Sequence, residues 1–125
     1  MEDSLGAFNA SDWERLVSFW ADDVEAVGPK DWPESGLYRG KESTLGQFKR
    51  LQDSWSSSEV EAVSHETKGD VTCTRLRWRV RGSASGLESD LDMWMLAEFE
   101  GELYSRIWYF MDEAEAREAF RRAAS

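Results

Sequence analysis

The sequence predicts an α+β fold in which helices pack against a curved antiparallel sheet, and three observations support this class. Charged and apolar side chains alternate along residues 71–81 and 88–99, which is the period of β-strands. Apolar residues recur at helical spacing near the N-terminus and again after residue 41. The 125 residues are enough for one hydrophobic core, so we expect a single domain over residues 1–125.

The remaining elements follow from the same two periods and from turn residues. In chain order, we expect a helical hairpin or one bent helix over residues 2–20, a short strand over 24–27, a helix over 41–56, strands over 59–67 and 71–110, and a closing helix after Asp112. The Pro- and Gly-rich segment 28–36 is expected to be a loop, and it carries Trp32. We expect Trp32 either to cover the mouth of a pocket or to fill the core.

Residues 71–99 predict a hairpin with one charged face and one apolar face. A turn signal at 83–86 separates a run of alternating arginines from a run of alternating acids. The expected cross-strand ion pairs are Arg81 with Glu88, Arg79 with Asp90 and Arg77 with Asp92. On the reverse face, Trp78 lies across from Leu91 and Leu76 lies across from Met93.

A second hairpin is predicted around Glu100 and Gly101, with Phe99 paired to Glu102 and Met95 paired to Arg106. One sheet face then collects Leu76, Trp78, Val80, Leu91, Met93, Met95, Tyr104, Arg106, Trp108, Phe110 and Asp112. This face is either the wall of a small-molecule pocket or a core wall that ends in a capping acid. A bulge near the turn would reverse the last strand and remove Asp112 from this face.

Composition excludes several classes of function. The net charge of −10 disfavours a nucleic-acid partner, which needs a basic surface. No segment approaches the length of a membrane span, so we expect a cytoplasmic protein. Seven tryptophans in a chain of this length indicate that some lie beside a ligand or at a dimer surface.

The single cysteine and the single histidine are too few for a metal site, and Cys73 has no histidine near it in the sequence that would activate it as a nucleophile. Cys73 is the single cysteine, and we expect it to be a small buried or interfacial residue in a reducing compartment. His65 is the single histidine, and we expect a solvated position near a turn. No metal and no cofactor are predicted.

Four segments resemble, in order and spacing, the SnoaL-like branch of the superfamily that contains nuclear transport factor two and ketosteroid isomerase. They are residues 8–13 (FNASDW), 21–24 (ADDV), 36–42 (GLYRGKE) and 109–116 (YFMDEAEA). The resemblance implies a cone-shaped, curved antiparallel sheet that is wrapped by about three helices around an apolar cavity. It also implies a homodimer, which we expect to form through the sheet.

The resemblance does not imply steroid isomerisation. Ketosteroid isomerases have a general-base aspartate directly before a proline, and this chain has Gly28 there. Their two oxyanion-hole donors would fall near Ser4 and Met95, so neither donor is present. SnoaL-type cyclases have an acid/base aspartate near the end of the last long strand, where this chain has Asp112.

Two interpretations of Asp112 stay open. The Asp-x-x-Glu spacing favours a helix N-cap, whereas apolar neighbours such as Trp108 and Phe110 would raise the pKa of a general base. Arg106 either binds an acidic group of a substrate or forms an ion pair with Asp112 or another acid.

We therefore expect a cavity that binds a flat hydrophobic molecule of polyketide or terpenoid type. The expected contacts are Trp20, Trp32, Tyr38, Trp78, Met93, Arg106, Trp108 and Phe110. If the protein is an enzyme, Asp112 would transfer protons in a cyclisation, isomerisation or dehydration. The alternatives are a non-catalytic ligand-binding or dimeric interaction module and a purely structural homodimer. The residues expected at the dimer interface are Trp94, Leu96, Ile107 and Tyr109.

Overall fold

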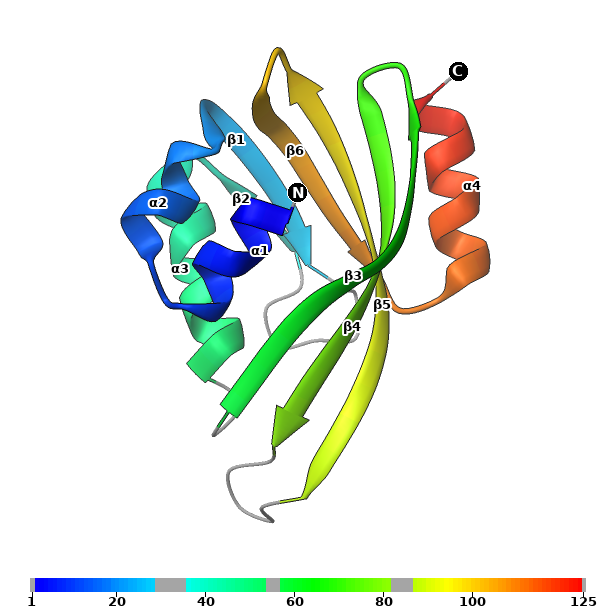
Figure 1. Ribbon diagram of the computed structural model, residues 1–125. Coiled ribbons are helices and arrows are strands. Elements are labelled where there is room, and N and C mark those ends of the chain that lie inside the picture. Colours follow the sequence, from blue (N-terminus) through cyan, green and yellow to red (C-terminus); the bar gives the residue numbers. More distant parts are fainter. Residues whose placement is uncertain (1, 29–35, 54–56, 82–86, 125) are drawn as a thin grey trace.

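A computed structural model describes residues 2–28, 36–53, 57–81 and 87–124, which form four helices and one six-stranded sheet (Figure 1). The helices are α1 (Glu2–Asn9), α2 (Trp13–Ser18), α3 (Lys41–Asp53) and α4 (Glu113–Ala123). The strands are β1 (Trp20–Gly28), β2 (Gly36–Arg39), β3 (Ser57–Lys68), β4 (Val71–Arg81), β5 (Glu88–Glu100) and β6 (Leu103–Phe110). The α+β class is thereby confirmed.

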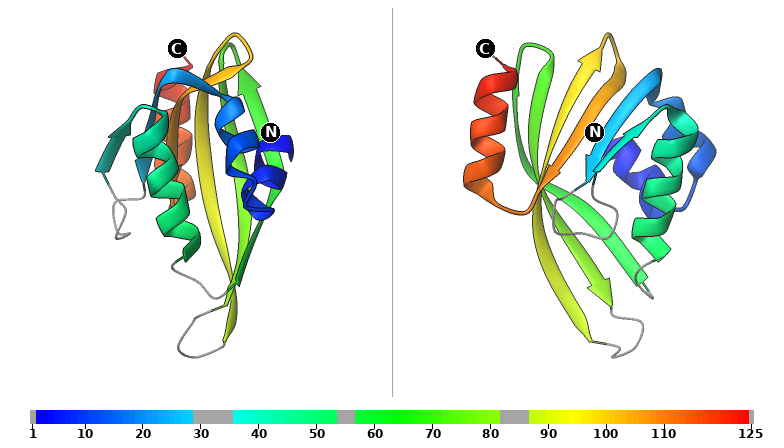
Figure 2. Two further views of the ribbon diagram at one scale, coloured as in Figure 1. Left: turned by 90° about the vertical axis from the view of Figure 1, so that its left-hand side faces the viewer. Right: turned by 180° about the vertical axis from the view of Figure 1, so that it is seen from behind.

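The sheet is curved and open, with helices on both faces (Figure 2). Its strand order is β2-β1-β6-β5-β4-β3. We call the face that carries α1, α2 and α3 the inner face, and the face that carries α4 the outer face. The predicted antiparallel meander is confirmed from β3 to β6, but β1 lies parallel to β6, an arrangement that the sequence did not indicate.

The β4–β5 hairpin has the predicted register. Arg81 pairs with Glu88 and Arg79 with Asp90, where the Arg79 Nε to Asp90 Oδ1 distance is 3.7 Å. These side chains are exposed to solvent, so each ion pair contributes little to stability. The register is fixed by the inner face instead, where Trp78 is buried, because a slip of one residue would expose it.

The β5–β6 hairpin differs from the prediction at two points. Its turn pairs Glu100 with Leu103, a shift of two positions along β6 that leaves the parity of the strand unchanged. One extra residue, Ser105, then forms a bulge against Glu98 and reverses the parity of the rest of β6. Within the bulge, the Ser105 hydroxyl donates a 2.9 Å hydrogen bond to the Glu98 carbonyl.

This bulge decides which side of β6 enters the core. Tyr104 lies before the bulge and Ile107 after it, and both are buried. Met95 pairs with Tyr109 and not with Arg106, so beyond residue 105 the predicted inner and outer positions of β6 were wrong as well. The later inner positions of β6 are therefore Ile107 and Tyr109.

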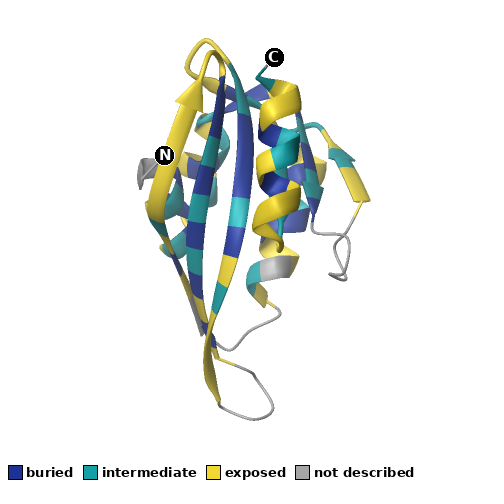
Figure 3. Cartoon of the chain, turned by 90° about the vertical axis from the view of Figure 1, so that its right-hand side faces the viewer, coloured by how far each residue is buried: buried dark blue, intermediate teal, exposed yellow. Residues whose placement is uncertain are grey.

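The outer face of the sheet is covered by α4 along β4 and β5. Val71 and Leu96 pack there against Ala116 and Phe120, with Cys73 partly buried beside them. Figure 3 shows the buried side of α4 turned toward the sheet and its exposed side turned toward solvent. Next to β4, β3 is an edge strand of the sheet, and its His65 is exposed, as expected.

Deletion of Ser105 should destabilise the fold much more than truncation of its side chain. Without the bulge, either Tyr104 or the segment that carries Ile107 must turn outward, which should lower the free energy of unfolding by about 3 kcal/mol or more. Ser105→Ala keeps the bulge and loses one hydrogen bond, at a cost of about 1 kcal/mol. Urea denaturation compares the two variants, and equal losses would contradict this role of the bulge.

Candidate functional site

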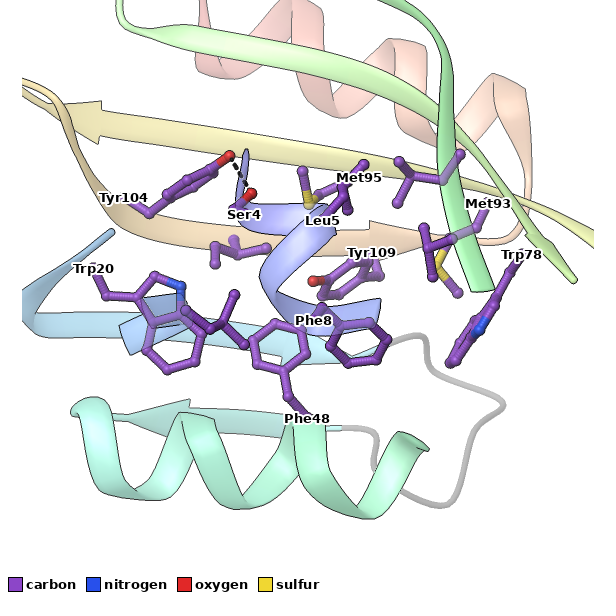
Figure 4. A pocket seen from close by; sticks show the side chains of 14 residues that line it. Ser4, Leu5, Phe8, Trp20, Phe48, Trp78, Met93, Met95, Tyr104 and Tyr109 are labelled. Atoms are coloured by element: carbon purple, nitrogen blue, oxygen red, sulfur yellow. Dashed lines mark hydrogen bonds between the residues drawn. The ribbon is translucent and has the colours of Figure 1, made fainter. Parts of the chain in front are cut away.

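A cavity of about 60 Å³ lies between the inner face and the first three helices, and it is partly open to solvent. Figure 4 shows the side chains of the lining, which come from α1, α2, α3 and five of the strands. The lining residues are Ser4, Leu5, Phe8, Leu16, Trp20, Phe48, Val60, Leu76, Trp78, Met93, Met95, Tyr104, Ile107 and Tyr109. Almost all of this surface is apolar.

Aromatic rings form the framework of the cavity. The Phe8 ring stands edge-on to Phe48 and to Trp78, with centroid distances of 6.0 Å and 6.3 Å. Phe48 also contacts Trp20 at 5.3 Å and Tyr109 at 6.0 Å. Such ring pairs contribute stability beyond their buried area, so they hold the cavity walls in place.

The polar groups of the lining are three hydroxyl groups and the indole N–H groups of Trp20 and Trp78. Ser4 Oγ and the Tyr104 hydroxyl lie 3.2 Å apart and share a buried hydrogen bond. Burial raises the pKa of Tyr104, and the hydrogen bond with Ser4 only partly offsets this effect. Burial also raises the pKa of Tyr109 well above the usual range of a phenol, with a smaller effect of Tyr104. Both phenols are therefore neutral at physiological pH.

No carboxylate, histidine, lysine or arginine occurs among the described lining residues. A general base that works near neutral pH needs such a group within hydrogen-bond reach of the substrate. The described residues also contain no cluster of three or more metal-ligating side chains. The cavity is therefore suited to an apolar molecule, but these residues include no general base that would work near neutral pH.

Three of the predicted contact residues line this cavity, namely Trp20, Trp78 and Met93. Tyr38 lies on β2 and is not part of the lining; its ring is 5.7 Å from the Arg50 guanidinium. Trp32 lies outside the described residues.

The other three predicted contacts lie on the outer face, because the bulge reverses β6. Arg106, Trp108 and Phe110 line an open groove of about 780 Å³ between β6 and α4. Arg106 Nε is 3.3 Å from Glu25 Oε2, so the ion-pair interpretation of Arg106 is confirmed, with Glu25 as the acid. This groove is larger than the inner cavity, but charged side chains line much of it and it is shallow and open.

Asp112 caps α4 and does not line the inner cavity. Its Oδ1 accepts a 2.8 Å hydrogen bond from the Ala114 backbone N–H, and the residue is exposed. The predicted helix cap is therefore confirmed. Asp112 is exposed, so Trp108 and Phe110, which line the outer groove, do not enclose it as a buried base would require.

Two of the four residues expected at a dimer interface face inward instead. Ile107 and Tyr109 line the cavity, and Leu96 is buried under α4. Trp94 is half-buried on the outer face, with its ring 5.9 Å from the Arg75 guanidinium. The dimer itself stays a prediction, but this set of four residues cannot form one surface.

Most of the helical residues that line the cavity were not predicted as site residues. Ser4, Leu5, Phe8, Leu16 and Phe48 belong to helices whose apolar spacing was recognised, and this spacing predicted packing. Their position opposite the inner sheet face would identify them as lining residues, but that position depends on the tertiary structure.

Comparisons with known proteins agree with this architecture. The sequence matches the SnoaL-like domain over residues 1–107. The chain belongs to the SnoaL-like family. No curated protein matches its sequence.

Several solved structures share the fold of this SnoaL-like chain at low sequence identity. A nuclear transport factor two-like protein of unknown function from Burkholderia pseudomallei has a TM-score of 0.80 at 16% identity, covering 95% of this chain and 92% of that one. TerC, co-crystallised with polyporic acid, has a TM-score of 0.79 at 18% identity, covering 95% and 93%. A ketosteroid isomerase-like protein from Catenulispora acidiphila, in complex with trimethylamine, has a TM-score of 0.77 at 13% identity, covering 96% and 90%.

None of the described helices has the length and apolarity that a membrane span requires.

Substitutions at Asp112 should separate the capping role from a charge-dependent role. Asp112→Ala removes the acceptor for the Ala114 N–H and should lower the free energy of unfolding by about 1 kcal/mol. Asp112→Asn retains an acceptor oxygen and should leave stability close to wild type. Thermal denaturation of both variants provides the test, and an Asn variant as unstable as the Ala variant would contradict the cap.

The buried phenol of Tyr109 should make the stability depend on pH in the alkaline range. Unfolded Tyr109 loses its proton above about pH 10, while the folded protein retains it, so unfolding releases a proton. The stability of wild type relative to Tyr109→Phe should therefore be constant below pH 10 and then fall by about 1.4 kcal/mol per pH unit. Urea denaturation between pH 8 and pH 11 measures this difference, which would stay flat if the phenol were solvated.

Proposed function

We propose that this protein binds a small, mainly apolar molecule in the inner cavity and acts as a binding module without acid–base catalysis. The observation that carries the proposal is the composition of the lining: aromatic and aliphatic side chains enclose a space in which the described residues place no ionised group. Apolar concave sites with a few polar groups are typical of small-molecule binding.

The size of the cavity limits the ligand. An apolar cavity of about 150 Å³ takes one benzene molecule, and the cavity here measures about 60 Å³. A single ring therefore enters if nearby side chains shift or if the ligand extends through the opening. Met93 and Met95 lie in the wall, and their unbranched side chains adapt readily to a new shape. The volume thus favours a ligand of one ring over a larger molecule of the polyketide or terpenoid type expected from the sequence.

The catalytic alternative has less support. Asp112, the one acid that the family resemblance suggested, caps α4 on the other side of the sheet. Ser4 and Met95, at the positions that the resemblance gives to the isomerase oxyanion hole, do line the cavity. Methionine offers no strong hydrogen-bond donor, so this pair cannot form the usual two-donor oxyanion hole.

The TerC structure adds support from the fold. That protein was co-crystallised with polyporic acid and shares this fold. This co-crystallisation supports ligand binding by a chain of the same fold, and the lining of the inner cavity would determine which molecule suits it here.

A variant that fills the cavity should abolish binding of a neutral apolar probe. We expect ethylbenzene to bind wild-type protein and to raise its thermal stability, by about 1.4 kcal/mol at a free concentration of ten times the Kd. Leu5→Trp places an indole in the cavity and should weaken binding at least about tenfold. Titration calorimetry and thermal denaturation measure both effects.

The matched control is Leu103→Trp, because Leu103 is 40% exposed and lies outside the lining. This variant should bind ethylbenzene like the wild type. Equal affinity of all three proteins would place the binding site elsewhere, and no binding by any of them would contradict the proposed function.

A further inference from the structure

The Tyr109 hydroxyl is the polar group of the cavity that is best placed to contact a ligand. It points into the cavity (Figure 4), and the described residues give it no hydrogen-bond partner. Tyr109 is partly buried, so a ligand that covers its hydroxyl displaces water, and an acceptor on that ligand replaces the lost hydrogen bond. Its ring is held from one side by Phe48, at a centroid distance of 6.0 Å, which fixes where the hydroxyl points.

A second polar group lies on the same strand. The Tyr104 hydroxyl and Ser4 Oγ are hydrogen-bonded at 3.2 Å, and both residues belong to the lining. Tyr104 and Tyr109 are close enough for their phenols to interact electrostatically. The Ser105 bulge makes this combination possible, because residues 104 and 109 would otherwise lie on opposite sides of β6.

We infer that the Tyr109 hydroxyl, in the same lining as the Ser4–Tyr104 pair, is a subsite for one neutral oxygen of the ligand, so that the cavity selects a phenol, alcohol or ketone over a carboxylate of similar shape. This inference rests on the proposed function, since it assigns a substrate class to the same cavity. The apolar part of the ligand would contact the aromatic framework. Its oxygen would exchange a hydrogen bond with Tyr109, which can both donate and accept.

The selection against carboxylates follows from the charge of the lining. A carboxylate that enters the cavity loses its hydration and finds no cation among the described lining residues. Tyr104 shows the same preference within the protein itself, because burial raises its pKa despite a hydrogen bond to Ser4. A neutral oxygen incurs a much smaller desolvation cost, which one hydrogen bond can offset.

Three probes of similar shape test the inference: ethylbenzene, 4-ethylphenol and 4-ethylbenzoate, titrated calorimetrically at pH 7. At this pH the phenol is neutral and the benzoate is ionised. Wild-type protein should bind 4-ethylphenol at least about 30-fold more tightly than 4-ethylbenzoate. Comparable affinity for these two probes would overturn the inference, and this comparison needs no variant.

Tyr109→Phe removes the hydroxyl and keeps the ring. We expect 4-ethylphenol to bind this variant about fivefold more weakly, while the affinity for ethylbenzene changes less than about twofold. Tyr38→Phe is the matched control, because Tyr38 lies outside the lining, and it should change neither affinity. Circular dichroism verifies that both variants are folded.

The outcomes separate the two proposals. Suppose that ethylbenzene binds the wild type, but that Tyr109→Phe weakens the binding of ethylbenzene and 4-ethylphenol equally, or of neither. The subsite would then be contradicted, while the proposed binding in the apolar cavity would be retained. If neither ethylbenzene nor 4-ethylphenol binds the wild type, the proposed function and the subsite both fail.

Discussion

The strand β6 has to supply side chains to two layers at once, and the rest of the structure depends on how it does so. It lies between β1 and β5, with the cavity on its inner side and the groove beside α4 on its outer side. A regular strand would assign its side chains strictly by alternation. The extra residue at Ser105 breaks that alternation once, so that Tyr104, Ile107 and Tyr109 all face the cavity while Arg106 and Trp108 face outward.

Charge and polarity are separated by the same sheet. The described ion pairs lie on the outer face, on the hairpin of β4 and β5, and along the exposed helix surfaces. Glu25, for example, lies between Arg39 and Arg106, with a distance of 3.3 Å to each. The cavity keeps only hydroxyl groups and indoles as polar features. A strongly acidic protein can thus contain an interior that suits a neutral ligand, because solvent and nearby arginines screen the outer charges.

Much of the fold could be predicted because its signals are local. The charged alternation on both sides of residues 83–86 determined the β4–β5 register, and helical spacing located α1, α2 and α3. Trp20, Trp78 and Met93 do line the cavity. Trp78 and Met93 lie where a regular strand period holds, whereas Trp20 begins β1 and does not end the predicted helix. The parallel pairing of β1 with β6 could not be predicted, because it joins segments about 80 residues apart in the sequence through no shared pattern.

The site residues on β6 could not be assigned from the sequence for a specific physical reason. Ser105 is an ordinary strand residue, whereas bulges are recognisable in a sequence mainly when a glycine marks them. In residues 103–110, apolar side chains occupy both the odd and the even positions, because the outer face of the strand is also partly apolar. Both parities therefore looked acceptable, and the choice depended on one inserted residue.

The bulge also affects how evolutionary relatives of this chain can be aligned. At sequence identities of 13–18%, an alignment through β6 depends more on where gaps are placed than on identical residues. A relative with a regular strand here needs a gap opposite residue 105. Without that gap, every later position of β6 would be matched to a residue that points to the opposite face, and catalytic roles would be transferred from the interior of one protein to the surface of the other.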